Sequence, residues 1–146
     1  MKIFNSIDIS ASGMTAERTR MEVISKNIAN ASVTRTSNGT PYRRQMVVFK
    51  RNETSPFSAY LSKFTNELQK AEGVKVSQIV EDTTPYKQIF EPGHPDADEN
   101  GYIQMPNVDI TTEMVDMISA TRAYEANMSS INSAKNIAMK ALEIGR

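Results

Sequence analysis

The sequence contains no cysteine, no tryptophan and a single histidine, His94, among its 146 residues. Without cysteine the chain has no disulfide, no thiolate zinc site and no cysteine nucleophile, and one histidine excludes a multi-histidine metal site within one chain. The sequence has no run of about 18 apolar residues, so we expect no membrane-spanning helix. Its first residues also lack the apolar stretch of a cleaved secretory signal peptide.

Neither sign of charge is in excess, because 17 Lys and Arg balance 17 Asp and Glu. A formal net charge of zero argues against a protein that binds nucleic acid by neutralising phosphates. The two halves of the chain nevertheless have net charges of opposite sign. Residues 1–73 hold 11 basic and 6 acidic residues, and residues 74–146 hold 6 basic and 11 acidic residues. Either the halves fold onto each other or copies of the chain attract head to tail, and composition leaves both open.

The first segment has the apolar spacing of a long helix. Ile7, Met14, Met21 and Ile28 are each seven residues apart, and Ile24 falls on the flanking position of the same heptads. A stripe of this length predicts a helix over about residues 3–31 that packs along a nearly parallel partner.

The last segment repeats its apolar residues at alternating spacings of four and three. This predicts a helix from about residue 110 almost to residue 146, with Thr111 or Thr112 as its N-cap. The stripe consists of Ile110, Met114, Met117, Thr121, Tyr124, Met128, Ile131, Ala138 and Leu142. Both stripes are wider than a pair of helices needs, so either the middle of the chain or other copies and partner proteins must cover the surplus. We favour the second alternative, because methionine-rich faces adapt to partners.

The middle of the chain favours short strands separated by turns. Strands are predicted over about residues 42–51, 74–81, 86–91 and 101–105. Between the first two, apolar residues at helical spacing predict a short amphipathic helix over about residues 57–72.

The expected fold is therefore mainly α with a small β insertion. Residues 1–32 and 108–146 are expected to form an antiparallel coiled-coil stalk of N- and C-terminal helices. A β-rich inserted domain with one short helix is expected over residues 33–107.

One stretch matches the opening of an EF-hand calcium loop, with oxygen ligands at Asp96, Asp98 and Asn100 and the sharp-turn glycine at Gly101. The position that should close the coordination shell with glutamate is Asn107. We therefore expect a turn stabilised by Asp and Asn side chains and keep weak calcium binding as the alternative.

No catalytic constellation is found in the sequence. His94 has no second histidine or cysteine to work with, and a rigid surface turn is its better interpretation. The Arg43-Arg44 pair, with Lys50 and Arg51, either contacts an anionic surface or is solvated or paired with acids, which is the more common case. We expect no enzyme activity and no cofactor.

Several short stretches occur together in the order typical of one bacterial family. They are Ala11-Ser12-Gly13-Met14, Asn27-Ile28-Ala29-Asn30, Tyr42-Arg43-Arg44-Gln45, residues 91–102, residues 105–109, Glu113-Met114-Val115 and residues 120–127. The chain resembles the flagellar basal-body rod proteins, in particular those of the proximal rod. Two features depart from that family: Gly13-Met14 replaces the usual Ala-Leu, and residues 52–72 match no family motif and are interpreted as a lineage-specific insertion.

The resemblance implies a structural, non-enzymatic protein that helps to transmit torque across the periplasm. Such proteins are exported from the cytoplasm by the flagellar type III export apparatus, without a cleaved signal peptide, and polymerise in the periplasmic rod of the basal body. The implied partners are other copies in a helical assembly, other proximal and distal rod proteins and the adaptor between rod and membrane ring. No nucleic acid is implied.

We expect the assembly interface on the two terminal helices. Its expected residues are Ile7, Met14, Met21, Ile24, Asn27, Ile28, Asn30, Met114, Met117, Tyr124, Asn127, Met128, Ile131 and Leu142. The amides of Asn27 and Asn30 would either bond backbone groups or reach a neighbour. The competing functions are a calcium-binding module and a free-standing coiled-coil adaptor.

Overall fold

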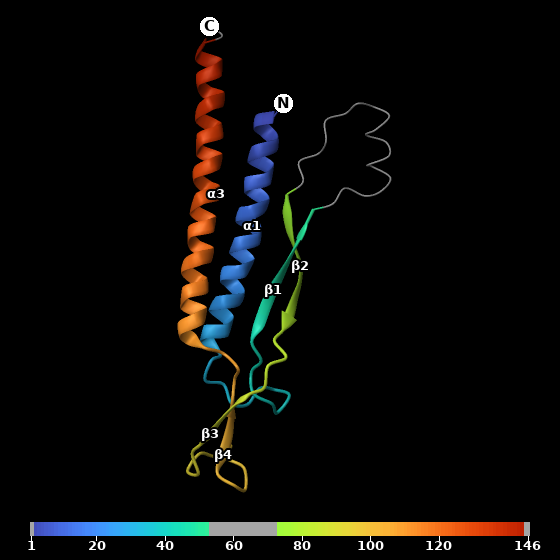
Figure 1. Ribbon diagram of the computed structural model, residues 1–146, viewed down its shortest axis with the longest axis vertical. Helices are drawn as coiled ribbons and strands as arrows, with labels where there is room; N and C mark the ends of the chain where they lie inside the picture. Colours follow the sequence, from blue (N-terminus) through green and yellow to red (C-terminus); the bar gives the residue numbers. More distant parts are fainter. Residues whose placement is uncertain (1, 53–72, 145–146) are drawn as a thin grey trace, which may run out of the picture. The chain divides into compact units, whose positions relative to one another are not determined.

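The computed structural model describes residues 2–52 and 73–144, and the side chains from residue 5 onward. Figure 1 shows a long helix at each end of the chain, α1 (Lys2–Ala29) and α3 (Ile110–Ile144). The predicted terminal helices are thus confirmed. The helix expected over residues 57–72 lies outside the described residues. Within the described part, neither helix is apolar enough over its length to cross a bilayer.

The ends of the helices are set by their own side chains. Lys26 lies in the last turn of α1, where a positive charge is favourable. At the start of α3, the Asp109 carboxylate accepts the backbone N–H of Thr111 at 3.0 Å. Asp109 is therefore the N-cap, and the prediction of Thr111 or Thr112 was wrong, because both lie inside the helix. Sequence favours each of the three as a cap, but only Asp109 precedes the first turn.

The strands form two separate two-stranded sheets. In one, β1 (Gln45–Arg51) pairs with β2 (Val74–Glu81). In the other, β3 (Lys87–Phe90) and β4 (Tyr102–Met105) are antiparallel, with Ile89 opposite Ile103. All four predicted strands are confirmed within a few residues. Over the described residues, the middle of the chain is nevertheless not clearly β-rich, because these strands are short.

The chain divides into two compact units, and each takes part of each helix. The first contains Met1–Thr19, Phe49–Ser77 and Thr121–Arg146, and the second contains Arg20–Val48 and Gln78–Ala120. The expected division near residues 33 and 107 stays a prediction.

In the first unit, the described contacts between α1 and α3 involve small or polar residues. The Ser10 hydroxyl donates to that of Ser130 at 3.3 Å, and Gly13 faces the side chain of Asn127. The start of β2 is held to α1, because the backbone N–H of Val74 donates to the Ser12 hydroxyl at 3.1 Å.

In the second unit, a small core forms where α1 and α3 meet residues of the middle segment. Apolar side chains are buried together with two polar ones, Asn27 and Glu113. The buried apolar side chains are Val23, Ile24, Pro41, Tyr42, Ile103, Pro106, Val108 and Ala120. The core thus depends on polar groups that must find partners inside it.

Candidate functional site

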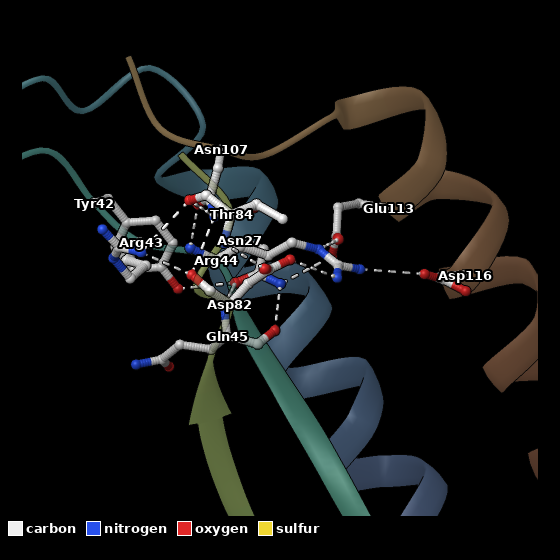
Figure 2. Close-up of polar contacts among 10 residues, drawn as sticks. All are labelled: Asn27, Tyr42, Arg43, Arg44, Gln45, Asp82, Thr84, Asn107, Glu113 and Asp116. Carbon is white, nitrogen blue, oxygen red and sulfur yellow. Dashed lines mark hydrogen bonds and ion pairs between the residues drawn. The ribbon is translucent and has the colours of Figure 1, made fainter. Parts of the chain in front are cut away.

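Asn27 is the centre of a polar cluster in the second unit (Figure 2). Its side chain is 1% exposed. Its amide nitrogen donates to the backbone oxygen of Gln45 at 2.9 Å and to Glu113 at 3.0 Å. Its amide oxygen accepts the backbone N–H of Gln45 at 3.0 Å and the hydroxyl of Tyr42 at 2.9 Å. Two donors and two acceptor positions are the full capacity of an asparagine amide, so the side chain is completely used.

Glu113 brings a negative charge into the same cluster and is fully buried. Nε of Arg44 donates to its carboxylate at 2.6 Å, and Asn27 donates to the other oxygen. The Arg44 guanidinium also lies 3.6 Å from Asp82 and 3.6 Å from Asp116. Asp116 in turn pairs with Arg20 at 3.2 Å. Each buried charge therefore has an opposite charge beside it, as burial requires.

Asn107 and Arg43 extend the cluster toward the loop after β2. The Asn107 amide accepts the backbone N–H of Arg44 at 2.8 Å and donates to the Thr84 hydroxyl at 2.7 Å. The Arg43 guanidinium lies 4.5 Å from the centre of the Tyr86 ring and donates to the backbone oxygen of Asp82 at 3.0 Å. Arg44 is thus paired with acids of its own chain, as expected, whereas the partners of Arg43 are a tyrosine and a backbone oxygen.

The cluster shifts the acidity of its members. Burial raises the pKa of the Tyr42 phenol, and the charges of Glu113 and Glu81 raise it further. Burial lowers the pKa of Arg44, but its bond to Glu113 and the three nearby carboxylates outweigh this, so the pKa is raised. For Asp82, the backbone N–H of Thr84 lowers the pKa of the carboxyl; burial opposes this, and the Thr84 hydroxyl and Arg44 reinforce it.

In this arrangement the charged groups hold one another and the backbone. The two oxygens of Glu113 are occupied by Arg44 and Asn27, so this carboxylate is placed as a structural partner rather than as a proton acceptor for a substrate. The ion pairs join basic residues of the first half to acidic residues of the second. For these pairs, the first of the two alternatives left open by the composition holds, because both charges belong to one chain.

The stretch resembling a calcium loop forms a turn. One oxygen of Asp98 accepts the backbone N–H groups of Asn100 and Tyr102, at 2.9 and 2.8 Å, which is the expected Asp-stabilised turn. Asp96 instead accepts the Thr34 hydroxyl at 2.9 Å. Gly101 has φ of +79°, and a Cβ there would lie 3.0 Å from the Phe90 ring, so the turn requires glycine. Among the described residues, no group of three or more His, Cys, Asp or Glu is arranged to hold a metal ion.

The expected interface residues differ widely in exposure. Ile24 and Asn27 are buried, whereas Met114, Met128 and Leu142 are exposed, with Leu142 at 75%. The half-buried ones are Ile7, Met14, Met21, Ile28, Asn30, Met117, Tyr124, Asn127 and Ile131. The Asn30 amide donates to the backbone oxygen of Lys26 at 2.8 Å, so both asparagines bond backbone groups.

Large apolar side chains remain exposed along α3. In the second unit they occupy its first turns, where Met114 is 57% exposed although its neighbour Glu113 is fully buried. They are Ile110, Met114, Val115 and Ile118 there, and Met128, Ile137, Met139, Leu142 and Ile144 in the first unit. The buried residues of α3 are instead Glu113 and Ala120. The surplus that the sequence predicted is therefore left uncovered by the described residues.

Sequence reasoning did not identify the polar cluster. The signals were present, since Tyr42-Arg43-Arg44-Gln45 and Glu113-Met114-Val115 both stood out as motifs. What the spacing did not reveal is that Glu113, in a polar position of the predicted first turn, points inward to meet Arg44.

Comparison with protein families defines the class. Residues 7–35 match the family described as "Flagella basal body rod protein", and residues 99–144 match "Flagellar basal body rod FlgEFG protein C-terminal". The matched parts contain most of α1 and α3, including Asn27 and Glu113. The two terminal helices are therefore similar to those of a class of flagellar rod proteins.

Full-length relatives narrow the assignment. The chain is 45% identical to the flagellar basal-body rod protein FlgC of Bacillus subtilis (strain 168), over 100% of both chains. It is 43% identical to that of Borreliella burgdorferi, over 99% of this chain and 98% of the relative. Identity to that of Escherichia coli O6:H1 is 39%, over 100% of both. The chain belongs to the FlgC family of flagellar basal-body rod proteins.

Proposed function

We propose that this protein is a structural subunit of the proximal rod in the flagellar basal body and that it polymerises through α1 and α3. The observation that carries this proposal is the exposure of large apolar side chains on α3, four of them in the second unit and five in the first. Isolated exposed apolar residues are common, but a series of nine along one helix marks a surface that a partner covers. The role is structural and not catalytic.

We propose further that α1 and α3 form an antiparallel coiled coil. In the first unit Ser10 contacts Ser130, and in the second Asn27 contacts Glu113. In each pair the two residue numbers add to 140. A constant sum is expected when two helices run in opposite directions, because residue numbers then increase along one helix where they decrease along the other. Residues of this pairing that are half-buried, such as Met21 and Ile131, would lie at the edge where copies meet.

We infer the partners from the family and from the geometry of contacts between copies of one protein. A contact between two different surfaces of the same protein does not close, and it generates a helical array. We therefore propose self-association in a helical assembly, together with contacts to other rod proteins, proximal and distal, and to the adaptor at the membrane ring. The protein would be exported by the flagellar type III apparatus and function in the periplasmic rod.

The test is complementation of a bacterium that lacks its own copy of the gene. Met114→Asp and Leu142→Asp place a charge on the exposed apolar surface, and burying an unpaired carboxylate in an interface costs several kcal/mol. Both variants should abolish swimming and disappear from isolated basal bodies. Circular dichroism of each purified variant should match that of the unchanged chain, since both positions are exposed in it.

Ser119→Asp is the matched control, because Ser119 is an exposed polar residue of the same helix. This variant should swim. Normal swimming of both Met114→Asp and Leu142→Asp would rule out the apolar surface of α3 as the assembly interface. If the unchanged chain does not restore swimming and is missing from basal bodies, the proposed function itself fails.

A further inference from the structure

Two Asn-Gly pairs occur in the sequence, Asn38-Gly39 and Asn100-Gly101. Both lie in turns of the second unit, and both glycines have positive φ, +77° and +79°. In each pair the glycine N–H donates to the backbone oxygen of the residue three positions earlier, at 2.9 Å. The two pairs are therefore identical in sequence and alike in local conformation, so a difference in their chemistry must come from their surroundings.

An asparagine that precedes glycine can react with its own backbone, because glycine has no Cβ to shield its nitrogen. The glycine nitrogen attacks the side-chain carbonyl carbon of the asparagine, a C–N bond forms, and the bond to the amide nitrogen breaks. The proton lost by the glycine N–H leaves with that nitrogen as ammonia. Water then opens the cyclic imide at one of its two carbonyl carbons, which gives aspartate or isoaspartate. The reaction requires that the glycine N–H leave its hydrogen bond and be reached by base.

The turn at Asn100-Gly101 is held from several sides. One carboxylate oxygen of Asp98 accepts the backbone N–H groups of Asn100 and Tyr102, at 2.9 and 2.8 Å. The backbone N–H of Asp98 donates to the backbone oxygen of Tyr102 at 2.9 Å, and that of Glu91 donates to Gly101 at 2.9 Å. Gly101 is also buried. Release of its N–H therefore requires the end of the β3–β4 hairpin to open.

The turn at Asn38-Gly39 lies in open solvent. Residues 37–40 are all exposed, and a Cβ built on Gly39 would meet no atom within 4 Å in the described part of the chain. The turn is closed by its own residues, because the backbone N–H and the hydroxyl of Thr36 both donate to the backbone oxygen of Thr40, at 2.9 and 2.8 Å. Exposed backbone hydrogen bonds with few packed neighbours open at low free-energy cost.

We propose that Asn38 is a site of spontaneous modification in the folded chain, where it is converted through a cyclic imide to aspartate or isoaspartate, and that the fold protects Asn100 from the same reaction. Either product adds a negative charge to a chain whose formal net charge is zero. Isoaspartate also adds a carbon atom to the backbone of the turn, which disturbs the bond from Gly39 to Thr36. The inference does not rest on the function proposed above.

The experiment is incubation of the purified full chain at mildly alkaline pH, followed by proteolysis and mass spectrometry of the peptides that contain Asn38 and Asn100. Conversion replaces the amide NH₂ by OH and raises the peptide mass, and labelling with an isoaspartyl methyltransferase detects isoaspartate. In the folded chain, Asn38 should be converted at least about tenfold faster than Asn100. No conversion of Asn38, or conversion of Asn100 at an equal or higher rate, would overturn the proposal.

The same incubation in urea tests whether the fold causes the difference. Unfolding removes the bonds of both turns, so the two asparagines should then react at similar rates. A preference for Asn38 that is as large in urea as in the folded chain would show that the neighbouring sequence, and not the fold, protects Asn100. Asn38→Gln is the matched control, because its longer side chain does not place the carbonyl carbon for a five-membered ring. This variant should lose most of the acidic species that isoelectric focusing detects in the unchanged chain.

Asp98→Ala tests the protection of Asn100 directly. It removes the carboxylate that holds the backbone N–H groups of Asn100 and Tyr102, so conversion of Asn100 should accelerate several-fold while that of Asn38 is unchanged. Asp98→Asn keeps an oxygen acceptor and should keep Asn100 protected. Circular dichroism identifies the variants that fold. A folded Asp98→Ala chain in which Asn100 stays as slow as before would overturn the role given to this turn, and if Asp98→Ala does not fold, its two sites should react at similar rates, as in urea.

Discussion

Gly13 of α1 lies directly against the side chain of Asn127 of α3: a Cβ built on Gly13 would stand 3.0 Å from the Asn127 amide nitrogen and 3.1 Å from its oxygen. The Asn127 amide is itself held, because it donates to the backbone oxygen of Ala123 at 3.0 Å. The glycine, which weakens the helix around it, therefore provides the space that Asn127 occupies.

We predict that Gly13→Ala and Asn127→Ala are coupled. Alanine in place of a helical glycine stabilises by about 0.5–1 kcal/mol, and this gain should appear in full only when Asn127 is shortened. In the unchanged background the crowded Cβ should cancel or reverse it. Urea unfolding of the four chains measures the coupling, and equal effects of Gly13→Ala in both backgrounds would contradict it.

Replacing Arg44 should destabilise the chain more than replacing Glu113, its partner in the ion pair. Arg44→Met leaves a fully buried carboxylate with only Asn27 as a partner, so we predict a loss of about 3–5 kcal/mol in the free energy of unfolding. Glu113→Gln should cost less, about 1–3 kcal/mol, because Arg44 keeps Asp82 and Asp116. Circular dichroism during urea unfolding follows both variants, since the chain has no tryptophan. A larger loss for Glu113→Gln would show that we have assigned the vulnerable charge to the wrong residue.

Asp82 should make stability depend on pH in the acidic range. Its pKa is lowered in the folded chain from the ordinary value of 3.8. Its contribution to the free energy of unfolding is therefore complete above the pKa that Asp82 has in the unfolded chain. The contribution is lost as the pH falls through the lower pKa of the folded chain. We predict that the difference in unfolding free energy between the unchanged chain and Asp82→Asn is constant above about pH 5 and shrinks below about pH 4. A difference that stays constant down to about pH 3 would be the contrary result.

Gly73 should tolerate no side chain. A Cβ at this position would overlap the hydroxyl of Ser12, which accepts the backbone N–H of Val74 and donates to the backbone oxygen of Ile9 at 2.7 Å. Gly73→Ala should therefore destabilise by about 1–3 kcal/mol, as overpacking does. In a Ser12→Gly background, where the obstructing atoms are gone, the same change should cost less. Thermal unfolding of the two pairs of chains gives the comparison.

The sequence predicted the regular elements better than their contacts. Heptad spacing located α1, and alternation with turn residues located the strands, because period is a local property of the chain. The burial of Glu113 could not be predicted in this way. A glutamate in the first turn of a helix is ordinarily explained by the helix dipole and solvent, and its inward direction depends on Arg44, 69 residues away. The same limit applies to Asn27, whose four bonds come from three distant residues.

In the proposed rod, the polar cluster would have a mechanical consequence. Individual dispersion contacts between apolar side chains are weak, each contributing only about 0.1–0.2 kcal/mol. The bonds from Glu113 to Arg44 and Asn27 are short and directional, so any shear between α1 and α3 must stretch them at once. Force entering the start of α3 would then pass to α1 without slippage, and the adjacent apolar surface would stay free for neighbours.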